Sequence, residues 1–97
     1  MNQIDHLASH LHAAVAEELR HVGALLEQLS MLLVEDEHFT TNHFEQLQMF
    51  DLLIQCTGES AAVLDRMAAG AKSHDAIAPV RLTVVQDRLR AALAKAA

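Results

Sequence analysis

The chain has no tryptophan and no tyrosine, and it contains only three phenylalanines, three glycines, one proline and one cysteine. So few aromatic side chains leave few surfaces on which nucleic-acid bases could stack. Because glycine and proline are scarce while leucine and alanine are abundant, the composition favours helices over the tight turns of a β-sheet. The lone cysteine, Cys56, cannot form an internal disulfide, which is typical of a protein of the reducing cytoplasm.

Charge and hydropathy exclude further classes of protein. The formal net charge is −6 and no run of lysine and arginine occurs, so we expect no nucleic-acid partner. The longest apolar runs, such as MLLV at 31–34, are far too short to span a bilayer, so we expect no membrane partner. The first residues, MNQIDHLASH, lack the cationic start and apolar stretch of a signal peptide. We therefore predict an acidic, cytoplasmic protein.

Residues 3–35 show the periodicity of one long helix with a broad apolar face. Apolar side chains recur there at spacings of three and four, and a second apolar row lies beside the first. The first row consists of Ile4, Leu7, Leu11, Ala14, Val22, Leu25, Leu29 and Leu32. The second row consists of Val15, Leu19, Leu26 and Leu33.

A second long helix is predicted over residues 42–69. The sequence EDEHFTTN interrupts the first pattern, and Asn42 with Glu45 three residues later is typical of a helix cap and its reciprocal partner. Gly70 is a natural end for this helix. The helix carries two apolar rows, one with Phe44, Leu47, Phe50, Ile54, Ala61 and Leu64, the other with Met49, Leu52, Cys56, Val63 and Met67.

A third, shorter helix is predicted over residues 79–95, with Pro79 in its first turn. Two long helices joined by a short loop fold back as an antiparallel hairpin. One neighbouring helix cannot cover both apolar rows of the second helix, so the third helix or a second subunit must cover the rest. We therefore predict a single all-α domain over residues 1–97, a long antiparallel hairpin plus a short third helix, which dimerises into a four-helix bundle.

One acid and one amide stand out in the apolar stretch FDLLIQCTG of the second helix. Asp51 and Gln55 are four residues apart, so they lie about 40° apart on one side of the helix. We expect both side chains at the surface, held by apolar neighbours on either flank. They form either the solvated edge of an ordinary bundle helix or a pair of groups presented to another molecule.

The stretch LQMFDLLIQCTGES resembles the active helix of the chemotaxis phosphatase family CheZ, which carries an Asp and a Gln at positions i and i+4 in mid-helix. That family is built on a long helical hairpin that dimerises into a four-helix bundle. The resemblance covers Gln48 to Gly58 and the hairpin architecture. CheZ phosphatases are longer and end in an acidic tail helix that tethers their target, whereas the last helix here carries Arg81, Arg88, Arg90 and Lys95.

The resemblance implies an activity, a partner and two roles. In CheZ the Gln inserts beside the aspartyl phosphate of a response-regulator receiver domain and orients a water for in-line attack, while the Asp pairs with the receiver's active-site lysine. Carried over by position, Gln55 would hold the water and Asp51 would dock the lysine. The protein would need no cofactor of its own, because the receiver would bring its Mg²⁺. The alternative is a non-catalytic helical adaptor or dimerisation module that binds partner proteins through its apolar stripes.

Seven histidines raise the question of a metal site. Glu18 with His21 and Glu35 with His38 both match Glu-x-x-His, which di-iron helical bundles use in pairs. The two pairs lie about 260° apart around one predicted helix, so they cannot share a site within one chain. We therefore expect no native metal site.

Two further acids fall on the inward side of the predicted helices. Glu18 lies within the apolar arc of the first helix, and Asp65 lies similarly in the second. An isolated buried charge is costly. We therefore predict a buried polar layer that sets the helix register, with Arg66 or an arginine of the third helix as the partner.

Overall fold

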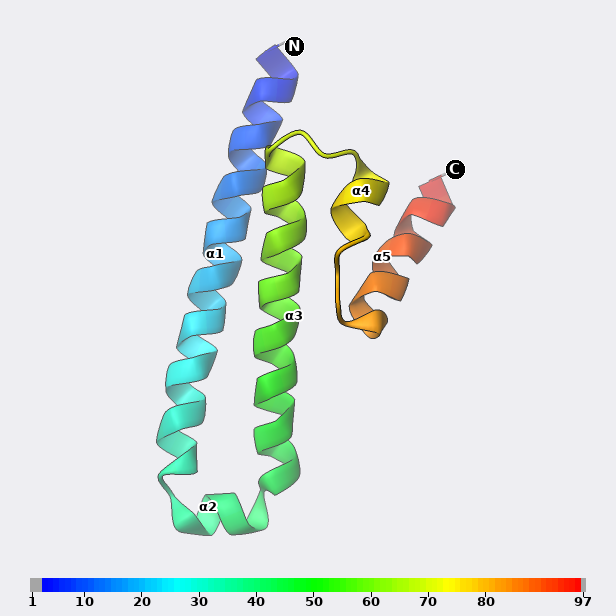
Figure 1. Cartoon of the computed structure of the whole chain (residues 1–97). Coiled ribbons are helices and arrows are strands. Elements are labelled where there is room, and N and C mark those ends of the chain that lie inside the picture. Colours follow the sequence, from blue (N-terminus) through cyan, green and yellow to red (C-terminus); the bar gives the residue numbers. More distant parts are fainter. Residues whose placement is uncertain (1–2, 97) are drawn as a thin grey trace.

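The computed structural model describes residues 3–96, and it describes side chains from His6 to Ala96. Within these residues the chain forms helices and no strand (Figure 1), which confirms the predicted all-α class. Two long helices pack side by side along most of their length. The elements are α1 (Gln3–Val34), α2 (Glu37–Asn42), α3 (Phe44–Ala68), α4 (Ser73–Ile77) and α5 (Thr83–Ala96).

The helices α1 and α3 form the predicted antiparallel hairpin, and the short α2 crosses between their ends (Figure 1). The predicted cap of Asn42 and Glu45 is wrong. Asn42 is the last residue of α2, where its side-chain amide donates to the carbonyl oxygen of His38 at 2.8 Å. The residue before α3 is His43, which makes no side-chain capping hydrogen bond. The reason is an extra helical turn, α2, which begins after a cap supplied by Asp36.

Small residues on α1 let the two long helices approach closely. A row of them recurs every seven positions on the side of α1 that α3 covers, where Ala16 and Gly23 are buried. A β-carbon added at Gly23 would lie only 3.1 Å from the Oγ1 atom of Thr57 on α3. The complete row is Ser9, Ala16, Gly23 and Ser30.

The segment after α3 folds as two helices rather than as one helix over 79–95. Gly70 has a φ of 104°, a left-handed conformation that favours glycine, and it follows the end of α3 as predicted. Pro79 does not open the third helix. It lies in the turn between α4 and α5, and α5 begins at Thr83. The physical reason is burial of Val80, which draws the connecting segment into the core.

The core lies where α4 and α5 cover the C-terminal half of α3. Its buried residues are Val63, Ala76, Val80 and Val85. No large side chain is completely buried within the described residues. The radius of gyration is 16.5 Å, whereas a compact domain of this length would have about 13 Å, and the principal extents are 56 × 25 × 18 Å. The hairpin is therefore elongated and encloses little of its own apolar surface.

One face of the hairpin remains apolar and exposed. Of the second apolar row on α1, Leu19, Leu26 and Leu33 are half-buried and Val15 is exposed, whereas the large side chains of the first row from Leu7 to Leu32 are all exposed. The N-terminal half of α3 extends beyond α4 and α5 and exposes apolar side chains of its own. We call the following set the apolar face: Leu7, Leu11, Val15, Val22, Leu25, Leu29 and Leu32 of α1 with Met49 and Leu53 of α3.

None of the helices in the described part of the chain is long and apolar enough to cross a membrane.

Candidate functional site

Asp51 and Gln55 lie one turn apart on α3, in the half that α4 and α5 leave open. Both side chains are exposed. Neither makes a side-chain hydrogen bond or an ion pair with any other residue that the structure describes, so both are free to bind another molecule. They line a hollow of about 390 Å³, here called the acidic hollow, together with Glu27, Ser30, Met31 and Ile54.

The position of this pair is set by the packing around it. Ile54 lies between the two residues in sequence, and its half-buried side chain holds this part of α3 against α1. One turn further on, Thr57 donates from Oγ1 to the carbonyl oxygen of Ile54 at 2.8 Å and meets Gly23 of α1. This close contact fixes the distance between the helices near Gln55. It places Glu27, one turn after Gly23, beside the pair.

The acidic hollow and the apolar face lie on opposite sides of the hairpin. Successive helical residues are rotated by about 100°, so residues two positions apart lie about 200° apart around the axis. On α1, Glu27 is two positions from both Leu25 and Leu29. On α3, Asp51 is two positions from both Met49 and Leu53. Because Glu27 and Asp51 line one hollow, the four apolar residues opposite them belong to the other face of both helices.

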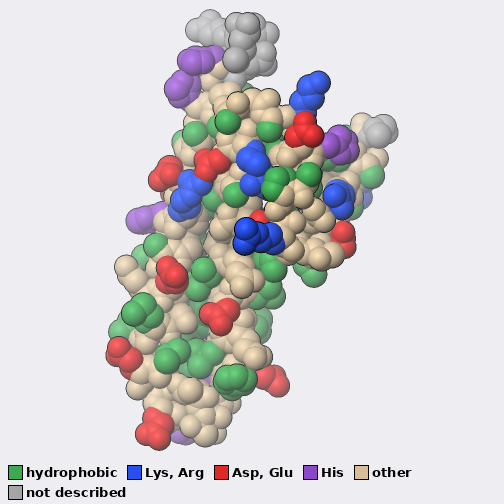
Figure 2. Space-filling view, in the orientation of Figure 1, with side chains coloured by type: hydrophobic (Ala, Val, Ile, Leu, Met, Phe, Trp, Pro, Cys, Tyr) green, Lys and Arg blue, Asp and Glu red, His purple; other side chains and the backbone are tan. Residues whose placement is uncertain are grey.

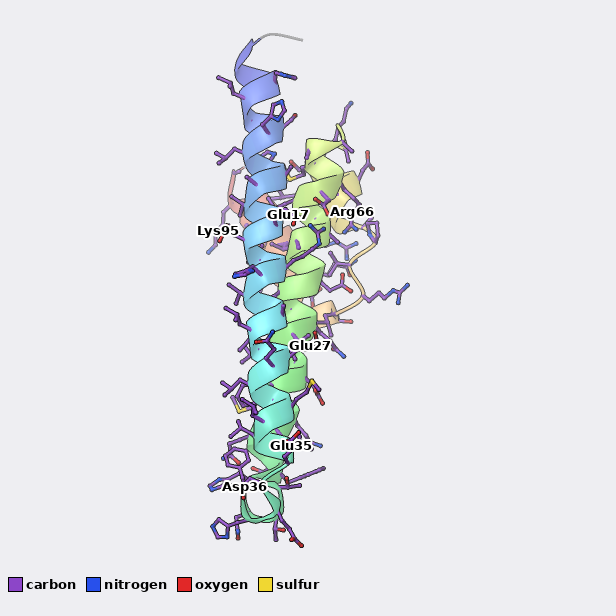
Figure 3. All side chains as sticks on the ribbon, turned by 90° about the vertical axis from the view of Figure 1, so that its left-hand side faces the viewer. Glu17, Glu27, Glu35, Asp36, Arg66 and Lys95 are labelled. Carbon is purple, nitrogen blue, oxygen red and sulfur yellow. The ribbon has the colours of Figure 1, made fainter. Side chains whose placement is uncertain are left out.

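The figures agree with this division. In Figure 3 the labelled side chains of Glu17, Glu27 and Arg66 lie toward one side of the α1–α3 pair, and Lys95 of α5 lies toward the other. Figure 2 looks onto the first of these sides. There the Lys and Arg side chains gather over the upper half, and the lower half carries separate Asp and Glu side chains.

A second hollow adjoins the first at Gln55. It has a volume of about 580 Å³ and lies between α3 and the segment that connects α4 to α5. Two arginines, from α3 and from that connecting segment, line it, so we call it the basic hollow. Its polar and apolar lining includes Gln55, Glu59, Arg66, Pro79, Arg81 and Leu82. The amide of Gln55 thus separates an acidic hollow from a basic one.

The predicted buried polar layer is not present among the described residues, because no charged residue there is buried as a whole. Glu18 is exposed. Asp65 forms an ion pair across the hairpin with Arg20 of α1, which also binds Glu17 at 2.8 Å. Arg66, the expected partner, instead donates from Nε to the carbonyl oxygen of Ala76 at 2.7 Å. The prediction failed because α3 packs against the edge of the apolar arc of α1 and leaves its centre open.

The histidines do not assemble a metal site in the described part of the chain. His6 and His10 contact each other through their Nε2 atoms at 3.1 Å. No group of three or more His, Cys, Asp or Glu side chains with metal-binding geometry occurs among the described residues. The pair of Glu18 and His21 and the pair of Glu35 and His38 therefore do not come together as one set of metal ligands.

Taken together, the fold and the site define a small helical-hairpin protein with one polar face and one apolar face. No protein-family model matches the sequence, and no curated protein and no solved structure is significantly similar to it. Its function is therefore inferred from the residues and their arrangement.

Proposed function

We propose that the protein is a CheZ-like phosphatase that accelerates dephosphorylation of the aspartyl phosphate of a response-regulator receiver domain in chemotaxis or another two-component pathway. The observation that carries the proposal is the joint exposure of Asp51 and Gln55 in one hollow on the polar face of α3. A cytoplasmic location, expected from the single Cys56, is part of the same proposal.

Gln55 is suited to holding a water for attack on an acyl phosphate. Its amide both accepts and donates hydrogen bonds, and it is neutral, so it does not repel a phosphoryl group as a carboxylate would. The water attacks phosphorus, the bond from phosphorus to the acyl oxygen breaks, and the receiver's aspartate leaves as a carboxylate with inorganic phosphate as the second product. This reaction needs positioning and compensated charge rather than covalent catalysis, and a packed helix supplies fixed geometry.

Asp51 is suited to docking a lysine of the receiver. It shares the acidic hollow with Glu27, so two carboxylates from different helices face one small space. No lysine or arginine lines this hollow. A lysine from a partner would meet two carboxylates there, and such complementarity favours a specific orientation of docking. The Mg²⁺ that the chemistry needs would come from the receiver.

We propose further that the protein is a homodimer joined through the apolar face. Monomeric proteins rarely expose large contiguous apolar patches. The exposed row on α1 runs from Leu7 to Leu32, a rise of about 38 Å, and Leu11 and Leu32 are 63% and 66% exposed. Two hairpins joined along this face make a four-helix bundle, which would leave both copies of Gln55 on the outer surface.

The test is the lifetime of phosphorylated receiver domains from the protein's own organism. The protein should shorten the lifetime of at least one receiver. Gln55→Ala should abolish the acceleration, while Gln48→Ala should keep it, because Gln48 is an exposed amide on the same side of α3, two turns away. If the purified protein shortens the lifetime of no receiver in the set, the proposal fails.

A second candidate function is a non-catalytic helical adaptor, and the size of the apolar face favours it. In this case the face binds helices of a different protein, and Asp51 with Gln55 is only a solvated edge. The two candidates differ in their dependence on each face. An adaptor keeps its activity when Gln55 is replaced and loses it when Leu25 is replaced.

A further inference from the structure

The basic hollow contains a guanidinium group that the fold holds in place but does not fully satisfy. Arg66 donates from Nε to the carbonyl oxygen of Ala76, which ties it to α4. Its Nη2 atom is buried and has no hydrogen-bond partner among the described residues. A buried donor without an acceptor is costly, and nearly all such groups in proteins bind a partner. The guanidinium of Arg66 therefore lines the basic hollow with a hydrogen-bonding donor that the described residues leave unpaired.

A second arginine adds positive charge to the same hollow. Arg81 is exposed in the segment between α4 and α5. Neither Arg66 nor Arg81 forms an ion pair with a carboxylate of the described chain, whereas Arg20 contacts both Glu17 and Asp65. Glu59 is the one acid in the lining, so two arginines and one glutamate leave a formal charge of +1. The hollow is positive in a protein whose net charge is −6.

We propose that the basic hollow is a binding site for a small oxyanion, either a phosphate group or a carboxylate. Arginine is the side chain best suited to both, because its planar array of donors matches their oxygens. The hollow is bordered by Gln55, so the bound anion lies beside the proposed catalytic amide. The site follows from its own side chains and does not depend on the proposed phosphatase activity.

If the proposed phosphatase activity holds, the docking surface carries opposite charges on the two sides of Gln55. A lysine enters the acidic hollow on one side of Gln55, and an anionic group enters the basic hollow on the other side. This anion is either the phosphoryl group itself, bound through its oxygens, or an acidic side chain of the docked receiver. The partner surface would thus present a cation and an anion on either side of its acyl phosphate.

The test is a titration of the unaltered, ¹⁵N-labelled protein followed by NMR, without any receiver present. Inorganic phosphate and acetate are added separately, with chloride keeping the ionic strength constant. Saturable shifts at Gln55, Arg66 and Arg81 with either anion support the site, and the anion that saturates at lower concentration identifies the source. Shifts of similar size at all arginines, without saturation, indicate only non-specific association and overturn the proposal.

The variant Arg81→Gln tests the assignment without disturbing the core, because Arg81 is exposed. Loss of its charge should weaken anion binding by about tenfold or more. Arg88→Gln is the matched control, since Arg88 is an exposed arginine of α5 outside the hollow, and it should leave binding unchanged. Equal affinity in Arg81→Gln and the unaltered protein overturns the proposal. Because receivers are absent, that failure is distinct from a failure of the phosphatase proposal.

Discussion

The two faces of the hairpin differ in the kind of side chain that they expose to water. The apolar face exposes large aliphatic side chains, such as Leu25 at 53% and Leu29 at 46%, that water solvates poorly. The polar face exposes groups that water solvates well, and Asp51 and Gln55 make no side-chain bonds there to the described part of the chain. Binding through the apolar face is stabilised by any apolar partner, whereas binding through the polar face is stabilised only by a partner with matching charges.

This difference separates assembly from recognition. Burying a half-exposed leucine contributes roughly 1 kcal/mol, and the contributions accumulate along α1 whatever the detailed shape of the partner. Polar groups contribute little in water unless their partners are placed to match them. The proposed association therefore belongs to the apolar face, and the proposed chemistry belongs to the polar face.

The largest expected effect is on the apolar face. Leu25→Asp places a charge at the centre of the proposed dimer interface, where it would be buried without a partner, so dimerisation should weaken by about a hundredfold or more. Sedimentation equilibrium measures the change. Ala24→Asp is the control, because the neighbouring position is exposed on the polar side of α1. Equal dimerisation of both variants would show that the apolar face is not the interface.

The next effect concerns the close contact between α1 and α3 at Gly23. Gly23→Leu should destabilise the hairpin by about 1–3 kcal/mol, because even a β-carbon at this position lies 3.1 Å from Thr57 Oγ1. Urea unfolding measures the loss. Ala24→Leu adds a similar side chain at an exposed position and should have little effect. A stable Gly23→Leu variant would mean that α1 and α3 do not pack this closely near Gln55.

The smallest expected effect is the change in the free energy of unfolding when Gln55 is replaced. Gln55→Ala should change the free energy of unfolding by less than about 0.5 kcal/mol, since Gln55 is exposed and forms no hydrogen bond through its side chain to the described residues. Urea unfolding monitored by circular dichroism is the measurement. A loss of several kcal/mol would instead point to a structural role for this amide.

The sequence was sufficient for the two long helices, because their apolar periodicity extends over many turns. It did not show which of the two apolar rows of α1 packs inside the hairpin. In the structure, α3 packs along the side of α1 that carries Ala16 and Gly23, and the bulky row containing Leu25 stays exposed. Small residues at seven-residue spacing were the available signal, since they permit close approach of two helices.

The candidate site was only partly accessible from sequence. The spacing of Asp51 and Gln55 placed them together, because helical neighbours follow from local geometry. The contributions of Glu27 and Arg81 could not be found in this way. Glu27 belongs to the other long helix, and Arg81 lies in a connection whose path depends on burial of Val80. Such contacts depend on tertiary packing, for which short stretches of sequence carry no pattern.

The most direct measurement is the dephosphorylation rate constant of a phosphorylated receiver at saturating concentrations of this protein. With Gln55→Ala we expect a rate constant equal to that of the receiver alone, together with unchanged receiver binding. A Gln55→Ala variant that accelerates dephosphorylation as much as the unaltered protein would show that Gln55 is not the catalytic amide.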